Sequence, residues 1–245
     1  GLPGLGSYGE GVIWSLAVDS EDNIWIATEV GLVKFDGDSS WTVYNMKNSG
    51  LPYNHVMSIE VDDIHGVVWV GTDGGGLARF DGEGWEVYTK ENSGIPGDIV
   101  RSIEVDRQGN LWVGTWGWVG TEGGSLAKFD GVRWTSYSTG NSGLPRNKVF
   151  ALAIDPKGNV WTGYYTYGGG VAKFDGRRWT VYTKENSGLP YDRIGCITTD
   201  LQGNIWVGIL ERGLLHGHTW KGGLVKFDGN DWTVYDEDNS ELPDN

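Results

Sequence analysis

Aromatic and acidic side chains gather in three short stretches of this sequence, at residues 116–122, 164–167 and 209–221. The residues concerned are Trp116, Trp118, Glu122, Tyr164, Tyr165, Tyr167, Glu211 and Trp220, with further carboxylates at Glu29 and Asp73. Flat aromatic faces beside hydrogen-bonding groups suit the apolar face of a sugar ring, and they also attract a cationic ligand. These residue types therefore indicate a binding site for a small molecule, with an oligosaccharide as one candidate.

The third stretch also contains His216 and His218, which are two residues apart and follow Glu211. In an extended segment, this spacing places two imidazoles on the same side, where they can serve as part of a zinc site. The set is incomplete as a metal centre. We therefore predict no metal and no cofactor, and we count both histidines among the ligand-binding candidates.

The motifs of common enzyme classes do not occur in the sequence. There is no Gly-x-Ser-x-Gly elbow, and the glycine runs at 74–76 and 168–170 fall in hairpins, not before a helix as a phosphate-binding loop requires. Paired carboxylates keep a glycosidase open, because their separation cannot be read from sequence. We predict no catalytic residues and a non-catalytic protein, with a lyase or glycosidase as the minor alternative.

Five copies of one repeat must position these residues. The Phe-Asp-Gly triplets that mark the copies begin at Phe35, Phe80, Phe129, Phe174 and Phe227, which gives spacings of 45, 49, 45 and 53 residues. A period of this size with four short alternating segments predicts a β-propeller. We predict an all-β fold of five blades with four antiparallel strands each, at approximately 11–54, 55–98, 99–147, 148–192 and 193–245, in one domain spanning 1–245.

The second copy illustrates the four strands, which we call A to D. Alternating or apolar runs predict strands at 56–61, 67–72, 76–80 and 85–88, separated by Asp- and Gly-containing turns. The Asp-x-x-Gly-Asn turn between strands A and B lacks the alternating oxygen ligands and the distal Glu of a calcium loop. We predict that its Asp caps the turn itself.

Nearly all length variation between the copies falls between strands B and C, in segments that we call the B–C loops. In an up-and-down blade these loops emerge at the same end as the connectors between blades, so all five crowd one rim. A varied rim on a constant scaffold is typical of a binding site. We expect the fourth-copy tyrosines to be exposed, because their loop is too short to bury three rings.

Arg101 is a further candidate at the same end. It occupies a strand A position that is Trp14, Met57, Phe150 or Gly195 in the other copies. A single positive charge at this position, near Glu104, could anchor a ligand or pair with a surface carboxylate.

Charge and hydropathy exclude several classes of partner. The net charge is −14, whereas nucleic acids and anionic membranes require a basic surface. No apolar run reaches the roughly 20 residues of a membrane span, so we expect neither nucleic acid binding nor membrane insertion. Cys196 is the single cysteine, and its place in a strand A predicts a small buried thiol.

The segments Asn48–Thr72, Asn141–Thr162 and Asn186–Gly208 resemble the two-component regulator propeller repeat. In that family the repeats form extracytoplasmic sensor domains of bacterial hybrid kinases, many of which respond to oligosaccharides. Related repeats occur in streptogramin lyases. The resemblance implies a bacterial, extracytoplasmic or secreted ligand-binding domain, although sensor propellers usually have seven blades and this sequence has five copies.

Two functions of different class follow from these observations. The first is non-catalytic recognition of a carbohydrate or similar small ligand at the rim of B–C loops. The alternative is a scaffold for protein interaction or self-assembly that binds no small ligand.

Overall fold

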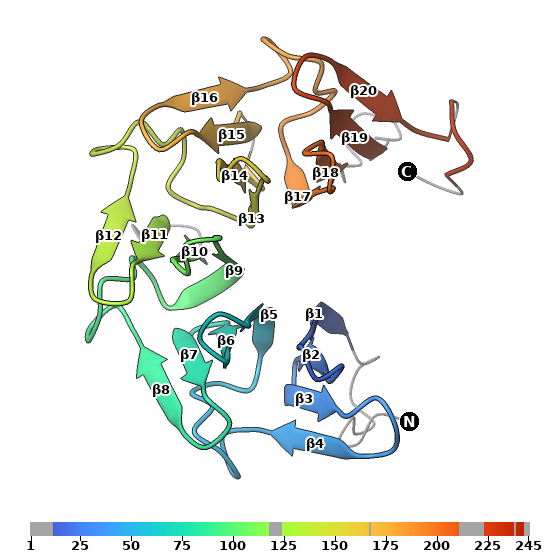
Figure 1. Cartoon of the computed structure of the whole chain (residues 1–245). Coiled ribbons are helices and arrows are strands. Elements are labelled where there is room, and N and C mark those ends of the chain that lie inside the picture. The colour runs from blue at the N-terminus through green and yellow to red at the C-terminus, as the bar shows by residue number, and fades with distance from the viewer. Residues whose placement is uncertain (1–11, 118–123, 167, 211–222, 238, 243–245) are drawn as a thin grey trace, which may run out of the picture. The chain divides into compact units, whose positions relative to one another are not determined.

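The computed structural model describes residues 12–117, 124–166, 168–210, 223–237 and 239–242. All its regular elements are strands, which form five four-stranded antiparallel sheets (Figure 1). In each sheet the strands pair in chain order, as in the blade of a propeller. The predicted all-β fold with four strands per blade is therefore confirmed. The described residues contain no helix that could span a membrane.

The strand bounds agree closely with those predicted for the second copy. Blade 1 consists of β1 (Ile13–Val18), β2 (Ile24–Thr28), β3 (Gly31–Phe35) and β4 (Trp41–Tyr44). Blade 2 consists of β5 (Val56–Asp62), β6 (Val67–Thr72), β7 (Leu77–Phe80) and β8 (Trp85–Tyr88). Blade 3 consists of β9 (Ile99–Val105), β10 (Leu111–Trp116), β11 (Leu126–Phe129) and β12 (Trp134–Tyr137). Blade 4 consists of β13 (Ala151–Ile154), β14 (Val160–Gly163), β15 (Val171–Phe174) and β16 (Trp179–Tyr182). Blade 5 consists of β17 (Ile194–Thr199), β18 (Ile205–Ile209), β19 (Gly223–Phe227) and β20 (Trp232–Tyr235).

The chain divides into two compact units, Gly1–Ser136 and Tyr137–Asn245, and each is described by itself. The first unit contains blades 1 and 2 and almost all of blade 3. The second contains blades 4 and 5.

The Asp of the A–B turn holds the turn together through both carboxylate oxygens. In blade 3, Asp106 Oδ1 accepts the backbone N–H of Asn110 at 2.9 Å. Its Oδ2 accepts the Asn110 side-chain amide at 2.8 Å and the Trp112 indole N–H at 3.1 Å. The same Asp–Trp bond recurs from Asp19, Asp155 and Asp200. These donors explain the Asp, Asn and Trp of the repeat and confirm the capping role.

Neighbouring blades pack through rings from their outer strands. In the first unit Tyr44 of blade 1 contacts Phe80 and Trp85 of blade 2 at centroid distances of 5.3 and 5.8 Å. A Cβ on Gly50 would lie only 2.5 Å from the Trp85 Cβ. The glycine of the Asn-Ser-Gly-Leu-Pro connector is therefore required because the outer tryptophan of the next blade lies against it.

Side chains at the Ser position of strand A point toward the following blade. Ser58 Oγ donates to the carbonyl oxygen of Val100 at 3.3 Å and is buried beneath blade 3. Cys196 occupies the same position in blade 5 and is exposed, so the prediction of a buried thiol is wrong. The physical reason is that blade 5 is the last of its unit, and no later blade of that unit covers the thiol.

Candidate ligand-binding site

A backbone irregularity marks the varied position of strand A. The register between strands A and B shifts at Trp14, Met57, Arg101 and Gly195, which each lie between two paired residues. Such β-bulges re-aim a side chain out of the regular alternation and are frequent beside binding sites. This strand A position carries a different residue type in each of these four copies, and the β-bulge directs its side chain out of the regular strand alternation.

In the first unit, side chains of three blades meet at this end. The Arg101 guanidinium lies 5.5 Å above the Trp14 ring, and its Nη1 is 3.3 Å from the Met57 sulfur. The His55 ring lies 5.3 Å from the Trp14 ring, and His55 Nδ1 is 3.2 Å from Asp73 Oδ2. An indole face, a guanidinium and an imidazole–carboxylate pair thus form one cluster, which we call the Trp14 cluster.

The other ring nitrogen of His55, Nε2, is buried and makes no hydrogen bond with the described residues. A catalytic histidine–carboxylate pair needs a nucleophile or a substrate proton within hydrogen-bonding reach of this atom. No hydroxyl or thiol of the described residues supplies one. The contact with Asp73 fixes the orientation of the imidazole.

The second unit carries a similar arrangement at the same repeat positions. The rings of Phe150 and Tyr165 stack at 5.0 Å with an interplanar angle of 27°. The Arg193 guanidinium lies 4.3 Å above the Tyr165 ring, and its Nε donates to the Tyr165 carbonyl oxygen at 3.3 Å. The Arg146 Nη2 approaches the carbonyl oxygen of Gly168, in the same B–C loop, at 3.5 Å.

The expectation of exposure is wrong for Tyr164, which is fully buried. Its hydroxyl is 2.7 Å from Thr162 Oγ1, and burial raises its pKa well above the ordinary value. The register explains the error, because Tyr164 takes the inward position that Thr72 and Thr115 occupy in strand B of other blades. Gly169, whose Cβ would collide with the Tyr164 side chain, leaves room for the ring. Tyr164 therefore belongs to the core and cannot contact a ligand at the rim.

The remaining predicted residues divide by where they lie. Tyr165 is half-buried in the stack described above, and Arg101 is half-buried in the Trp14 cluster. Trp116 is half-buried and ends strand β10, paired with Ile99, so it projects from a strand and not from a loop. Trp118, Glu122, Tyr167, Glu211, His216, His218 and Trp220 lie outside the described residues.

Sequence reasoning did not count Trp14 or Phe150 among the ligand-binding candidates, and it overlooked His55 and Arg193 altogether. The latter two immediately precede strand A, at a position that is Val12, Ile99 or Lys148 in the other copies. The signal was present, since this position varies in charge and size as much as the bulge position does. A comparison of segment lengths alone could not detect it.

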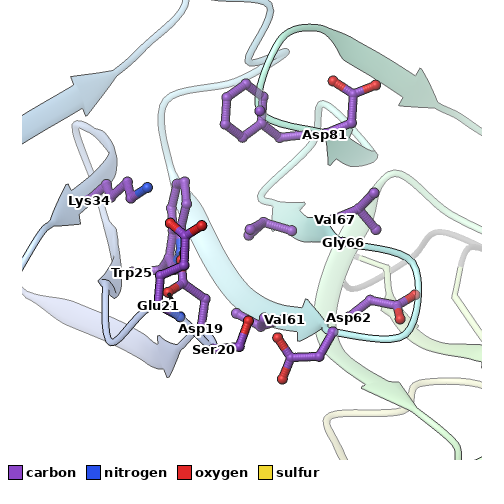
Figure 2. A pocket seen from close by; sticks show the side chains of 14 residues that line it. Asp19, Ser20, Glu21, Trp25, Lys34, Val61, Asp62, Gly66, Val67 and Asp81 are labelled. Carbon is purple, nitrogen blue, oxygen red and sulfur yellow. Dashed lines mark hydrogen bonds between the residues drawn. The ribbon is translucent and has the colours of Figure 1, made fainter.

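The cavities of the first unit lie away from this end. Figure 2 shows one of about 250 Å³ between blades 1 and 2, at the A–B and C–D turns. Its labelled residues are Asp19, Ser20, Glu21, Trp25, Lys34, Val61, Asp62, Gly66, Val67 and Asp81. Asp19 and Asp62 already accept the indole N–H groups of their own blades. Among the described residues, no group of three His, Cys, Asp or Glu side chains is placed to hold a metal ion.

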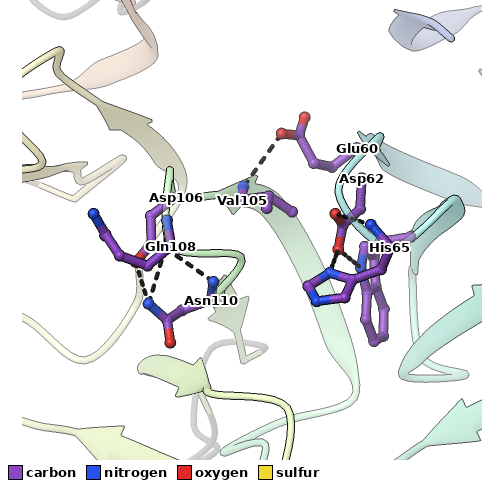
Figure 3. Close-up of polar contacts among 8 residues, drawn as sticks. Glu60, Asp62, His65, Val105, Asp106, Gln108 and Asn110 are labelled. Carbon is purple, nitrogen blue, oxygen red and sulfur yellow. Dashed lines mark hydrogen bonds and ion pairs between the residues drawn. The ribbon is translucent and has the colours of Figure 1, made fainter. Parts of the chain in front are cut away.

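Two glutamates occupy equivalent strand A positions of blades 2 and 3. Glu60 Oε1 accepts the backbone N–H of Val105 across the blade interface at 3.2 Å (Figure 3). Burial is the main cause that raises the pKa of Glu60 to about 7. The Val105 bond opposes this shift, and the charges of Asp62 and Asp63 add to it. Burial, followed by the charge of Glu60, raises the pKa of Glu104 to about 8. The Glu60 bond thus fastens blade 2 to blade 3.

Comparisons with known proteins agree with this architecture. The family model described as "Two component regulator propeller" matches residues 7–30 and 94–117. No curated protein matches the sequence. The chain thus carries two-component regulator propeller repeats, as the sequence resemblance predicted.

Solved structures share the fold at low sequence identity. The extracellular domain of a proposed hybrid two component system from B. thetaiotaomicron superimposes with a TM-score of 0.69 at 19% identity, over 94% of this chain and 39% of that chain. That of a proposed one component system from the same organism gives 0.73 at 20% identity, over 96% and 32%. Virginiamycin B lyase from Staphylococcus aureus, determined with quinupristin, gives 0.70 at 15% identity, over 97% and 73%. This chain therefore spans about a third to two fifths of the two sensor domains.

Proposed function

We propose that this propeller is a non-catalytic recognition domain that binds a carbohydrate or similar small ligand at the end carrying the B–C loops. The β-bulge position carries the proposal, because it turns a freely varying side chain out of strand A and surrounds it with aromatic and guanidinium groups. Aromatic faces bind the apolar side of a sugar ring, while the guanidinium donates hydrogen bonds to its hydroxyls.

The similar structures add support of a weaker kind. Two of them are extracellular domains of proposed one component or hybrid two component systems, in which recognition of an external ligand is the expected task. These similarities support our proposal that the chain belongs to an extracytoplasmic sensor of a bacterium.

The test is calorimetric titration with a panel of neutral and acidic oligosaccharides, using the intact chain and two variants, Trp14→Ala and Tyr165→Ala. We expect one class of sugar to bind, and at least one variant to weaken its binding tenfold or more, which is the usual effect of truncating an aromatic anchor. Trp41→Ala is the matched control, since Trp14 and Trp41 are both 40% exposed in blade 1.

An unchanged affinity in both variants would place the ligand elsewhere. If no sugar of the panel binds the intact chain, the result favours the alternative function, a scaffold for protein interaction or self-assembly.

A further inference from the structure

A groove of about 530 Å³ lies between blades 2 and 3, within the first unit. A second groove, of about 570 Å³, lies between blades 4 and 5 in the second unit. The lining residues correspond across the repeat: Tyr88, Asn92, Ser93, Phe129, Gly131 and Trp134 in the first match Tyr182, Asn186, Ser187, Phe227, Gly229 and Trp232 in the second. The groove itself is therefore a feature of the scaffold, which makes differences between its two versions informative.

Four residues that line the first groove depart from the other copies of the repeat. Arg79 replaces a lysine that the other four copies share, and Glu86 replaces a shared threonine. His65 lies in an A–B turn that is one residue longer than the others and lacks their asparagine. Val132 is the apolar member of a turn position that is otherwise Asp, Glu, Arg or Asn. All four changes meet in one groove, although they come from separate strands and turns.

The polar changes form a connected set on one side of the groove. Arg79 and Glu86 are directly opposite each other in the pairing of β7 with β8. Burial, followed by the neighbouring Glu86 carboxylate, raises the pKa of the Tyr88 hydroxyl to about 12. His65 Nδ1 is 2.7 Å from Asp62 Oδ2, which fixes the orientation of the imidazole, as Figure 3 shows. About half of the His65 side chain is exposed.

The opposite side of the groove is apolar. The Trp134 ring stacks on Phe129 at a centroid distance of 4.8 Å and contacts Tyr88 at 5.7 Å. Val132 extends this wall and is 83% exposed, which is unusual for a valine in a turn that otherwise carries polar residues. The groove thus presents an aromatic and aliphatic wall to a row of hydrogen-bonding groups.

We propose that this groove is a second ligand site, separate from the B–C end, and that it binds a neutral sugar unit. Arg79 Nη1 also lies 3.6 Å from Asp81 Oδ2, and Asp62 lines the same groove, so its carboxylates disfavour an anionic ligand. Hydroxyl groups both donate and accept hydrogen bonds, which matches a guanidinium donor beside a carboxylate acceptor. The apolar face of a pyranose ring fits against Trp134, and the cavity volume falls in the range of small-molecule sites.

The other copies of the repeat show which residue types the fold tolerates at each groove position, and these residue types define the test variants. Arg79→Lys with Glu86→Thr gives blade 2 the residues of the other four blades, so its fold is preserved. Lys173→Arg with Thr180→Glu is the matched control, because it places the same pair in the equivalent strands of blade 4. Saturation-transfer NMR and calorimetry would be used with three probes: cellobiose, maltose and N,N′-diacetylchitobiose.

We expect at least one probe to bind the intact chain and the blade 4 control, and to bind the blade 2 variant at least about tenfold more weakly. Trp14→Ala should leave this binding unchanged, which separates the groove from the B–C end. The proposal is overturned if none of the three probes binds, or if the blade 2 variant binds as the intact chain does. It is also overturned if Trp14→Ala abolishes binding and the blade 2 variant does not, because that result assigns the sugar to the B–C end.

Discussion

Removing the charge of Glu60 should stabilise the first unit at alkaline pH. The folded protein raises the pKa of this carboxyl from 4.5 to about 7, chiefly because the group is buried between blades 2 and 3. An acid with a raised pKa holds its proton more tightly in the folded state than in the unfolded state. Its favourable contribution is therefore complete below about pH 4.5 and is lost as the pH rises through 7.

The magnitude follows from the shift. One pKa unit corresponds to about 1.4 kcal/mol, so the change from 4.5 to about 7 sets an upper limit of about 3 kcal/mol on the stability lost through Glu60. Glu104 adds to the fall in the same direction, but the two carboxyls interact and their shifts belong to the pair, so the effects do not simply sum. We expect Glu60→Gln to raise the free energy of unfolding by about 1–3 kcal/mol at pH 8. The glutamine keeps an oxygen that can accept the Val105 N–H.

Urea unfolding of the intact chain and of Glu60→Gln, measured at intervals from pH 4 to pH 8, would test this reasoning. The two curves should agree near pH 4, diverge between about pH 4.5 and 7, and remain apart at pH 8, with the variant more stable. Glu91→Gln serves as the control, because it removes an exposed carboxylate from the same blade. A wild-type stability that does not fall between pH 5 and 8, or a variant that falls in parallel with it, would refute the assignment of a raised pKa to Glu60.

Two further substitutions test the packing rules of the blades. Gly94→Ala should lower the free energy of unfolding by about 2–4 kcal/mol, because the new Cβ would lie 2.2 Å from the Trp134 Cβ. Gly84→Ala is the control, since its new Cβ would have no contact closer than 3.9 Å and should leave stability nearly unchanged. Thermal unfolding of both variants would measure the difference. Tyr164→Phe should cost about 1 kcal/mol of stability through loss of the bond to Thr162, and should leave oligosaccharide affinity unchanged. A large loss of affinity in this variant, with stability retained, would contradict the placement of Tyr164 in the core.

The fold could be predicted because residues required by the same contacts recur in several copies of the repeat. Asp106, Asn110 and Trp112 recur together in four of the five copies, because one carboxylate binds the other two. The connector glycine was equally constant, but its cause was not visible. Gly50 is required by Trp85, which follows it by more than thirty residues and belongs to the next blade.

The site was harder to predict because the B–C loops were identified from differences in segment length, and not from the position of each residue in the repeat. Tyr164 was grouped with Tyr165 as part of one aromatic loop, although its repeat position is that of the buried Thr72. His55 was overlooked because it lies in a segment whose length does not vary. Comparing the copies position by position separates these cases, since adjacent residues at a strand end alternate between the core and the surface.

The β-bulge explains how a constant scaffold can tolerate a variable site. The same register shift occurs whether the residue is Trp14, Met57, Arg101 or Gly195, so the backbone does not depend on the side chain there. A side chain that the blade does not need for packing is free to change under selection for binding. Where the residue is glycine, the residue that follows strand B fills the space, because a Cβ at Gly195 would collide with the Leu210 side chain. The Trp14 cluster is therefore built from positions where a substitution has little effect on the stability of the fold. For this reason the side chains at this position differ from blade to blade, whereas the strand pairing is the same.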